Sequence, residues 1–451
     1  MIQNKSFNLV SLGCPKNRVD AERILYTMTR AGFIFTHQPE QAEILIINTC
    51  AFIEPAVEES IESVLEHREL NDEAILVVAG CLPLRYRGSL KRHLHEADLF
   101  VTPDQVAELP RRLESLLKTR PRSRRSTVAH GSEQRKKRGV PSDEPPFVDP
   151  DAGSRVATIP QDRLPAGEAY GPSPFDEVGS CGRILTTPGY AYLKIADGCS
   201  RHCRFCTIPS IRGPLQSVDS RVLEEEAQAL ASQGVRELVL VAQDLTAYGA
   251  DRREKGAFLE LLKRLRQVQG IRWIRLMYLH PEGIPRGISE IINESENILP
   301  YLDIPFQHVS DTVLRAMGRP WKGDRIRNLV DRLRTEIPGL VLRTTLMVGF
   351  PGEGDQEFAE LAEFVASYAI DRVGVFTYSP EEGTPAHTLG DPVERAVKEA
   401  RANEIRRIHS RFMEQRNRSK IGSLEQSLVE GISEETELLL QGRTWDQAPE
   451  V

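Results

Sequence analysis

Residues 192–213 read YLKIADGCSRHCRFCTIPSIRG, a short apolar run followed at once by three cysteines. Cys199, Cys203 and Cys206 form a CxxxCxxC pattern in the loop after this run. Three thiolates at such a spacing can surround one soft metal centre, and both zinc and iron–sulfur clusters accept them. Zinc would usually need a fourth protein ligand, for which His202 is a candidate. We favour a 4Fe-4S cluster with one open iron over zinc, and over three thiols that only fill apolar space.

The apolar run before these cysteines is the first of six expected strands between residues 189 and 378. The strand candidates are YAYLKIA, VRELVLVA, IRWIRLMYL, YLDIPF, LVLRTTLMV and IDRVGVFTY. Segments with helical spacing of apolar residues separate them. This alternation favours an α/β barrel or partial barrel, in which ligands bind at the carboxyl ends of the strands. We assign residues 186–409 to this domain.

A second alternation occupies residues 1–118, where the β-rich runs FNLVSLG, AEILIINT and AILVVAG are separated by amphipathic helical stretches. The pattern predicts a parallel, doubly wound, flavodoxin-like sheet. A cysteine follows each run, namely Cys14, Cys50 and Cys81. Because ligands of such sheets lie beyond the carboxyl ends of the strands, we expect these three thiols to converge at one edge.

Two segments do not follow the alternation. Residues 119–185 are rich in Arg, Lys, Pro and Gly, which favours a linker or insert. Its basic clusters could contact nucleic acid, although a solvated linker is the interpretation that we prefer. Cys181 lies in this segment and is expected to be a bystander thiol. Residues 410–451 contain short runs that fit a small β element, which we interpret as a partial β-barrel.

Composition limits the possible classes of protein. The chain has 451 residues, a formal charge of −7 and an isoelectric point of about 5.9, which argues against wholesale binding of nucleic acid. It contains no run approaching the ~20 apolar residues of a membrane span. The N-terminus does not look like a signal peptide. We therefore expect a cytoplasmic protein whose seven cysteines stay reduced.

The segments around both groups of cysteines resemble the radical S-adenosylmethionine (SAM) methylthiotransferases. The matching motifs are SLGCPKN, INTCAFIEPAVEESI, AGCLPLRY, YLKIADGC, VAQDLTAYG, YLDIPFQHVSDTVLRAMGR, VGFPGE and FTYSPEEGTPA. The tail, ending GRTWDQAPEV, is similar to the start of the TRAM β-barrel of the same family. SLGCPKN and IADGC most resemble the branch that methylthiolates the β-carbon of an aspartate in the small-subunit ribosomal protein S-twelve. The alternative is the branch that modifies an adenosine of tRNA.

The resemblance implies cofactors and partners. It implies a radical-generating 4Fe-4S cluster on Cys199, Cys203 and Cys206, and an auxiliary 4Fe-4S cluster on Cys14, Cys50 and Cys81. It also implies binding of SAM, for which Gln243, Gln307 and Arg343 are candidate contacts because they lie at or near strand carboxyl ends. The expected partners are the ribosomal protein and an electron donor such as flavodoxin or ferredoxin, with no membrane and a monomeric enzyme. A non-catalytic iron–sulfur or zinc protein that binds RNA is the rival of another class.

Overall fold

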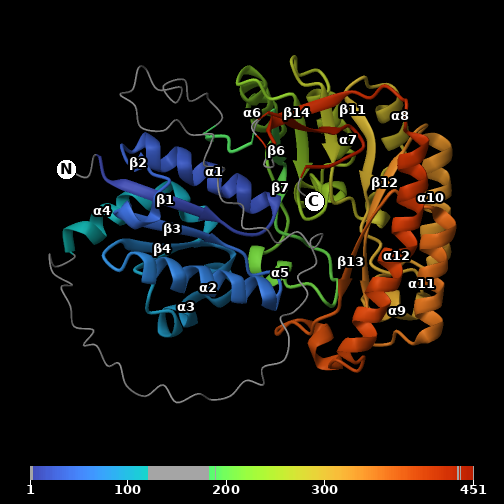
Figure 1. The fold of residues 1–451 in the computed structure, drawn as a ribbon, viewed down its shortest axis with the longest axis horizontal. Coiled ribbons are helices and arrows are strands. Elements are labelled where there is room, and N and C mark those ends of the chain that lie inside the picture. The colour runs from blue at the N-terminus through green and yellow to red at the C-terminus, as the bar shows by residue number, and fades with distance from the viewer. Residues whose placement is uncertain (1–3, 120–181, 188, 434–435, 437, 450–451) are drawn as a thin grey trace.

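The computed structural model describes residues 4–119, 182–187, 189–433, 436 and 438–449. Two α/β domains lie side by side, the N-terminal one in blue and the second in green to red (Figure 1). Each domain is built on a sheet whose strands are all parallel, as the alternation of strands and helices predicts. In the described part of the chain, no helix combines the length and the apolar character needed to cross a bilayer.

The N-terminal sheet has five strands in the order β2-β1-β3-β4-β5, which is the flavodoxin-like order. Its strands are β1 (Ser6–Ser11), β2 (Ile34–Phe35), β3 (Ile44–Thr49), β4 (Ile75–Gly80) and β5 (Leu99–Val101). Its helices are α1 (Pro15–Arg30), α2 (Glu54–Leu70), α3 (Cys81–His93) and α4 (Leu109–Thr119). Helices α1 and α4 pack on one face of the sheet and α2 and α3 on the other. The short edge strands β2 and β5 were not among the predicted strands.

The second sheet has six strands in sequential order, which makes an open, partial barrel and confirms the predicted fold class. Its strands are β6 (Tyr190–Lys194), β9 (Glu237–Val241), β10 (Trp273–Leu276), β11 (Ile298–Asp303), β12 (Val341–Val348) and β13 (Arg372–Thr377). The loop after β6 holds the small pair β7 (Ala196–Asp197) and β8 (Gln216–Ser217), with the short helix α5 (Ile208–Arg212) between them. Every strand candidate of the sequence corresponds to one strand of this sheet.

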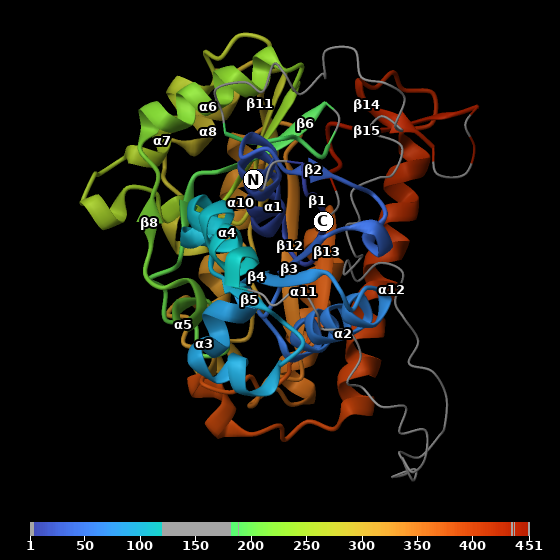
Figure 2. The ribbon, with the colours of Figure 1, turned by 90° about the vertical axis from the view of Figure 1, so that its left-hand side faces the viewer.

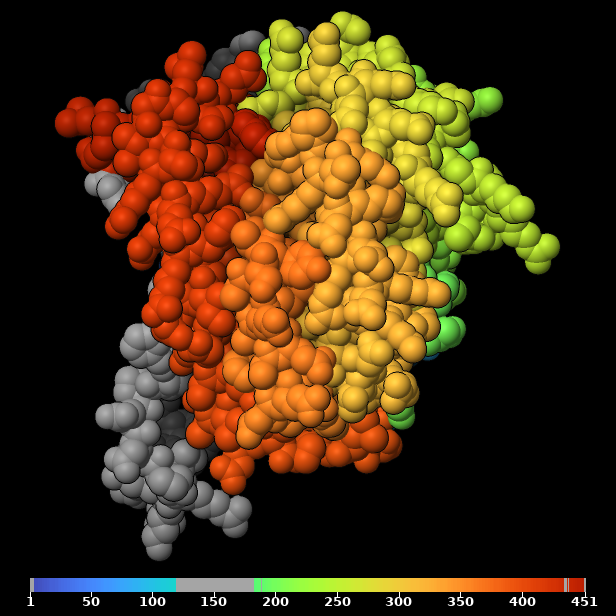
Figure 3. Space-filling model, turned by 90° about the vertical axis from the view of Figure 1, so that its right-hand side faces the viewer, coloured from blue at the N-terminus to red at the C-terminus, as the bar shows by residue number. Residues whose placement is uncertain are grey.

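Helices cover the outer face of the barrel, part of which Figure 3 shows as a continuous surface. These helices are α6 (Ser220–Ser232), α7 (Ala257–Leu265), α8 (Ile288–Asn293), α9 (Asp311–Ala316), α10 (Gly323–Glu336), α11 (Asp355–Tyr368) and α12 (Arg395–Ser419). Helix α12 continues without a break through residue 410. The apolar core between strands and helices uses alternate strand residues, as the two-residue period of a strand requires.

The inner face of the barrel is covered by segments from both ends of the chain. The other set of alternate strand residues, including Tyr192 and Trp273, forms a separate apolar cluster there. Val19 of α1 packs into this cluster from the N-terminal domain, which lies in front of the barrel in Figure 2. The C-terminal hairpin β14 (Ser427–Ile432) and β15 (Leu440–Thr444) is antiparallel and contributes Leu428. Helix α1 therefore belongs to the packing of both domains.

A buried ion-pair network fastens the two domains. Arg183 is fully buried and donates hydrogen bonds to Glu22 of α1 at 3.0 Å and to Glu226 of α6 at 2.7 Å. It also donates to the carbonyl of Tyr192 at 2.7 Å. Arg183 lies in the segment that we interpreted as linker, so at least residues 182–187 form part of the domain interface. Cys181 and the basic clusters lie outside the described residues.

Candidate functional site

Three cysteines of the N-terminal domain stand at the carboxyl ends of neighbouring strands. Cys14 caps α1 three residues after β1, Cys50 directly follows β3, and Cys81 begins α3 directly after β4. Because β1, β3 and β4 are adjacent in the sheet, these ends share one edge. This strand order supports the expectation that the three thiols lie near one another. Cys14 and Cys81 act electrostatically on the Cys50 thiol, and Cys14 acts on the Cys81 thiol.

Asn17 holds the three strand ends together. Its side chain is fully buried and donates hydrogen bonds to the carbonyl oxygens of Leu12 at 3.0 Å and Thr49 at 2.9 Å. Its Oδ1 lies 3.6 Å from the Cys81 sulfur, which donates to it. One amide thus contacts the segments that carry Cys14, Cys50 and Cys81. The SLGCPKN motif places this asparagine one helical turn after the first cysteine.

Close packing around these thiols needs a glycine and changes their acidity. Gly13 has φ of +87°, and a Cβ there would lie 2.9 Å from the Cys50 sulfur, so a larger residue would displace the thiol. Burial, followed by the neighbouring Cys14 and Cys81, raises the pKa of Cys50 to about 12. Burial also raises the pKa of Cys81, although Arg212 opposes the shift. A cationic or metallic partner would favour the thiolate forms.

The other trio lies in the loop between β7 and α5. The backbone N–H of Cys199 donates a hydrogen bond to the Gly213 carbonyl at 3.0 Å, which joins the two ends of this loop. Cys206 is tied to Cys203 by a backbone hydrogen bond of 3.2 Å. Burial is the largest cause that raises the pKa of Cys206 to about 12, and Cys203 and Cys199 add to it. The three thiols are free and partly accessible.

The zinc interpretation gains nothing from this geometry. His202 has an exposed side chain. In the ranges that the structure describes, no three His, Cys, Asp or Glu side chains form a group that could hold a metal ion. The same finding applies to the two cysteine trios, whose thiols are free and influence one another electrostatically but are not gathered around one point in the described residues. Thiolates are nevertheless the donors that an iron–sulfur cluster accepts.

Arg212 connects the two trios, and sequence reasoning did not single it out. Its guanidinium donates to the Cys81 sulfur at 3.2 Å and to Asn17 Oδ1 at 2.7 Å. It also donates to Asp20 at 3.1 Å and to Asp197, two residues before Cys199, at 2.9 Å. The side chain is only 3% exposed. The signal was present as the arginine of SIRG, but nothing in that motif indicates the residues it contacts.

Further contacts bring the two cysteine loops together. Thr207, next to Cys206, donates its hydroxyl to the carbonyl of Phe52 at 2.8 Å, two residues after Cys50. Glu381, from the FTYSPEEGTPA motif, accepts a hydrogen bond from the Glu54 N–H at 3.1 Å. The carboxyl edges of the two sheets therefore face a common junction.

The candidate SAM contacts take different positions. Gln243 lies two residues after β9 and donates to Asp197 at 3.1 Å, while its Oε1 is buried without a hydrogen-bond partner. Gln307 lies four residues after β11 with φ of +69°. Arg343 does not lie at the carboxyl end of its strand, because it is the third residue of β12. It stands level with Asp303, the last residue of β11, and bonds to it at 2.8 Å.

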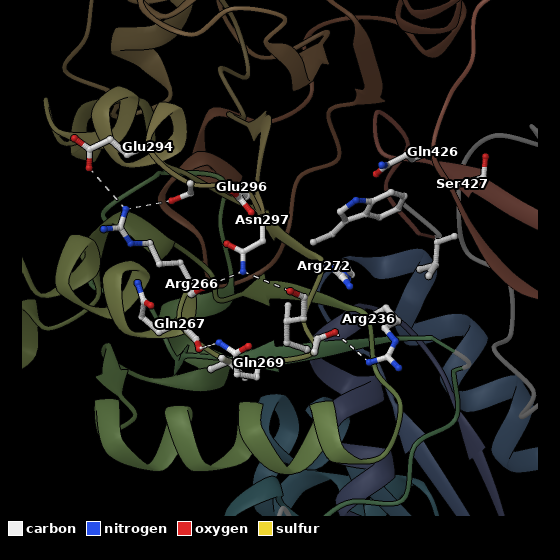
Figure 4. Close-up of a pocket in the computed structure, with 16 residues that line it drawn as sticks. Arg236, Arg266, Gln267, Gln269, Arg272, Glu294, Glu296, Asn297, Gln426 and Ser427 are labelled. Atoms are coloured by element: carbon white, nitrogen blue, oxygen red, sulfur yellow. Dashed lines mark hydrogen bonds and ion pairs between the residues drawn. The ribbon is translucent and has the colours of Figure 1, made fainter.

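A polar groove of about 1030 Å³ lies at the opposite end of the barrel, between the amino ends of the strands and the C-terminal hairpin (Figure 4). Arg236, Arg272 and Asn297 directly precede β9, β10 and β11 there. Arg236 donates to the Gly270 carbonyl at 3.2 Å, and Arg266 pairs with Glu294 at 3.7 Å. None of the cysteines lines this groove, so we place the functional site at the thiol-bearing junction.

Comparison with known families and proteins agrees with this division. Residues 6–102 match the model of the family described as uncharacterized protein family UPF0004, and residues 193–365 match that of the radical SAM superfamily. The fold is similar to that of the radical SAM methyltransferase TsrM from Kitasatospora setae, with a TM-score of 0.54 and 14% identity. That alignment covers 85% of this chain and 74% of TsrM.

Curated relatives are similar over the whole chain. A ribosomal protein uS12 methylthiotransferase RimO from Pelobacter propionicus is 42% identical, and one from Trichlorobacter lovleyi is 40% identical. Both alignments cover 100% of this chain and 91% of the relative. The RimO protein of Acetivibrio thermocellus is 38% identical over 99% of this chain and 91% of its own length.

Proposed function

Because this chain belongs to the RimO family of radical SAM methylthiotransferases, we propose that it methylthiolates ribosomal protein uS12, the small-subunit protein S-twelve. The target that we infer is the β-carbon of an aspartate side chain in that protein. The observation that supports this proposal from the structure is the junction at which two thiol trios, one from each α/β domain, flank Arg212.

The chain uses SAM and iron–sulfur chemistry, as the radical SAM domain indicates. We assign two 4Fe-4S clusters, a SAM-binding one on Cys199, Cys203 and Cys206 and an auxiliary one on Cys14, Cys50 and Cys81. Three thiolates for each cluster leave one iron of each open to a small ligand. When bound, these groups supply a carbon-centred radical, a sulfur atom and a methyl group, chemistry that no amino-acid side chain provides.

The residues of the chain hold the clusters, orient SAM and exclude water from the site. Asn17 and Gly13 fix the strand ends that carry the auxiliary thiols. Gln243 offers a buried, unpartnered Oε1 as a hydrogen-bond acceptor beside the SAM-binding loop, which supports its assignment as a SAM contact. We retain Gln307 and Arg343 as further SAM contacts, because Gln307 follows β11 and Arg343 bonds to Asp303, the last residue of that strand. Val19 and the C-terminal hairpin close the inner face of the barrel against water.

The proposed substrate and reaction lead us to propose where the enzyme works, what reduces it and its oligomeric state. An enzyme that acts on uS12 works in the cytoplasm, where ribosomes are assembled. Cleavage of SAM needs one electron at a time, which a flavodoxin or ferredoxin can donate. We propose that the enzyme acts as a monomer, since each trio is supplied by a single chain.

Mass spectrometry of a deletion strain tests the proposed function. We expect uS12 from the strain to lose a mass corresponding to one sulfur plus one CH₂, and the intact gene to restore it. The genes carrying Cys203→Ala or Cys50→Ala should fail to restore it. If the strain instead loses a methylthio group from tRNA while uS12 is unchanged, the proposal is wrong and the adenosine-modifying branch is correct.

A further inference from the structure

Lys16 lies in the first turn of α1 and reaches from the N-terminal domain to the barrel. It shares a helix face with Val19 and Asp20, three and four residues later, and both of these contact the barrel. The Lys16 side chain is buried, with 8% of the residue exposed. Its ammonium lies 4.1 Å from the centroid of the Tyr278 ring. Tyr278 follows β10 by two residues, so the ammonium stands at the mouth of the barrel.

Neighbouring cations at this junction are matched by carboxylates. Lys194 pairs with Asp20 at 2.5 Å, Arg212 with Asp197 at 2.9 Å, and Arg343 with Asp303 at 2.8 Å. Among the residues that the structure describes, no carboxylate lies within ion-pair distance of Lys16 and no side chain accepts a hydrogen bond from its ammonium. The Tyr278 face offsets part of the cost of removing a charge from water. Cys14 and Asp197 also favour the charged ammonium from beyond direct contact, and Arg212 opposes it. An anion bound directly beside the ammonium would meet the remaining cost.

The place of this unmatched charge indicates which anion it would bind. Lys16 is two residues from Cys14 of the auxiliary trio, while Tyr278 belongs to the barrel edge beside Asp303. A group bound by the ammonium therefore lies between the sulfur-bearing edge and the barrel mouth. Under the proposed function, the reacting carbon of the substrate lies in this space. In an aspartate, a carboxylate is bonded directly to this carbon.

We propose that Lys16 binds the side-chain carboxylate of the target aspartate and so selects aspartate as the residue to be modified. The inference rests on the proposed function, because it takes uS12 as the substrate. An ion pair to the carboxylate fixes the direction of the neighbouring C–H bonds. It also distinguishes aspartate from asparagine, whose amide has the same shape and no charge. A hydrogen bond between charged groups of this kind changes binding by roughly tenfold or more.

The experiment compares two forms of uS12, one with the target aspartate and one with asparagine in its place. Binding of each form to the cluster-loaded enzyme is measured by titration, and modification by mass spectrometry. The wild-type enzyme should bind the aspartate form roughly tenfold or more tightly than the asparagine form. Lys16→Met should bind both forms equally, and Lys16→Arg should recover part of the preference. Iron content and the Kd for SAM should stay unchanged in both variants.

Lys263→Met serves as the matched control, because Lys263 is exposed on α7 and pairs there with Glu260. It should retain the full preference for the aspartate form. The role of Lys16 is overturned if Lys16→Met keeps the wild-type preference, or if it weakens SAM binding while the preference persists. Loss of iron in Lys16→Met, with the preference intact in the remaining loaded enzyme, would also overturn it and assign Lys16 to the cluster loop. Failure of the wild-type enzyme to modify either form would instead contradict the proposed function.

Discussion

The Arg212 guanidinium donates a hydrogen bond to the Cys81 sulfur at 3.2 Å, although the two residues belong to different domains. The same guanidinium contacts Asp197, which precedes Cys199 by two residues. Burial lowers the pKa of Arg212, but the surrounding Cys81, Asp20 and Asp197 outweigh it and raise the pKa above its usual value. Arg212 is therefore a permanent cation that relates the positions of the two trios.

Replacing Arg212 should loosen this junction. Arg212→Met leaves part of the charge on Asp20 and Asp197 uncompensated, so we expect the free energy of unfolding to fall by about 3 kcal/mol in urea titrations. Arg212→Lys keeps the charge but not the planar fork, and should lose less. A methionine variant as stable as the wild type would show that Lys194, the other partner of both carboxylates, suffices alone.

The two trios should have separable roles. In the triple variant Cys14→Ala, Cys50→Ala and Cys81→Ala, reductive cleavage of SAM should persist while methylthiolation of uS12 stops. Iron content should fall to about half, because each cluster holds four irons. Chromatography of 5′-deoxyadenosine and an iron assay measure the two quantities. Cys203→Ala is the comparison and should abolish cleavage as well. Loss of cleavage in the triple variant, with its remaining cluster intact, would contradict the separation.

The Arg183 network should contribute strongly to stability. Arg183→Met leaves Glu22 and Glu226 buried with reduced compensation, which typically costs about 3–5 kcal/mol. Urea unfolding measures the loss. Arg264→Met is the control, since Arg264 pairs with Glu224 on the exposed side of α6 and should change stability by about 1 kcal/mol or less. Similar losses of stability in both variants would mean that burial does not increase the contribution of the Arg183 network to the free energy of unfolding.

His409 of α12 should make stability sensitive to mild acid. Burial, and then Arg372, lower the pKa of His409 from 6.5 to about 4. Between these values the unfolded chain binds a proton that the folded chain does not, so stability falls as the pH falls through this window. His409→Gln should remove about 2 kcal/mol of the stability difference between pH 7 and pH 4. Exposed His93 gives the control substitution, His93→Gln. An unchanged difference in His409→Gln would contradict the assignment.

Apolar periodicity predicted the strands that build both sheets. It did so because β3, β4 and the barrel strands are buried and rich in β-branched residues. It missed β2 and β5, since strands of two or three residues at a sheet edge carry too short a pattern.

The sequence predicted those parts of the candidate site that depend on neighbouring residues or on the ends of adjacent strands. Strand ends and cysteine spacing indicated both trios, because residues near in sequence or at one sheet edge share a position. The roles of Arg212, Asp197 and Arg183 depend on contacts between segments distant in the chain, which no periodicity reports. Arg343 was placed too near a strand end, although the predicted strand LVLRTTLMV already carries it in its first half, as β12 does.

The packing of α1 into the barrel has a consequence for how this protein can be divided. The concave wall of the open sheet carries Tyr190, Tyr192 and Trp273, and Val19 of α1 is one of the residues that cover it. A fragment comprising the barrel alone would expose that apolar hollow and invite self-association. The N-terminal domain thus covers the inner face of the barrel. A chimaera of related enzymes should therefore take α1 and the barrel from the same parent.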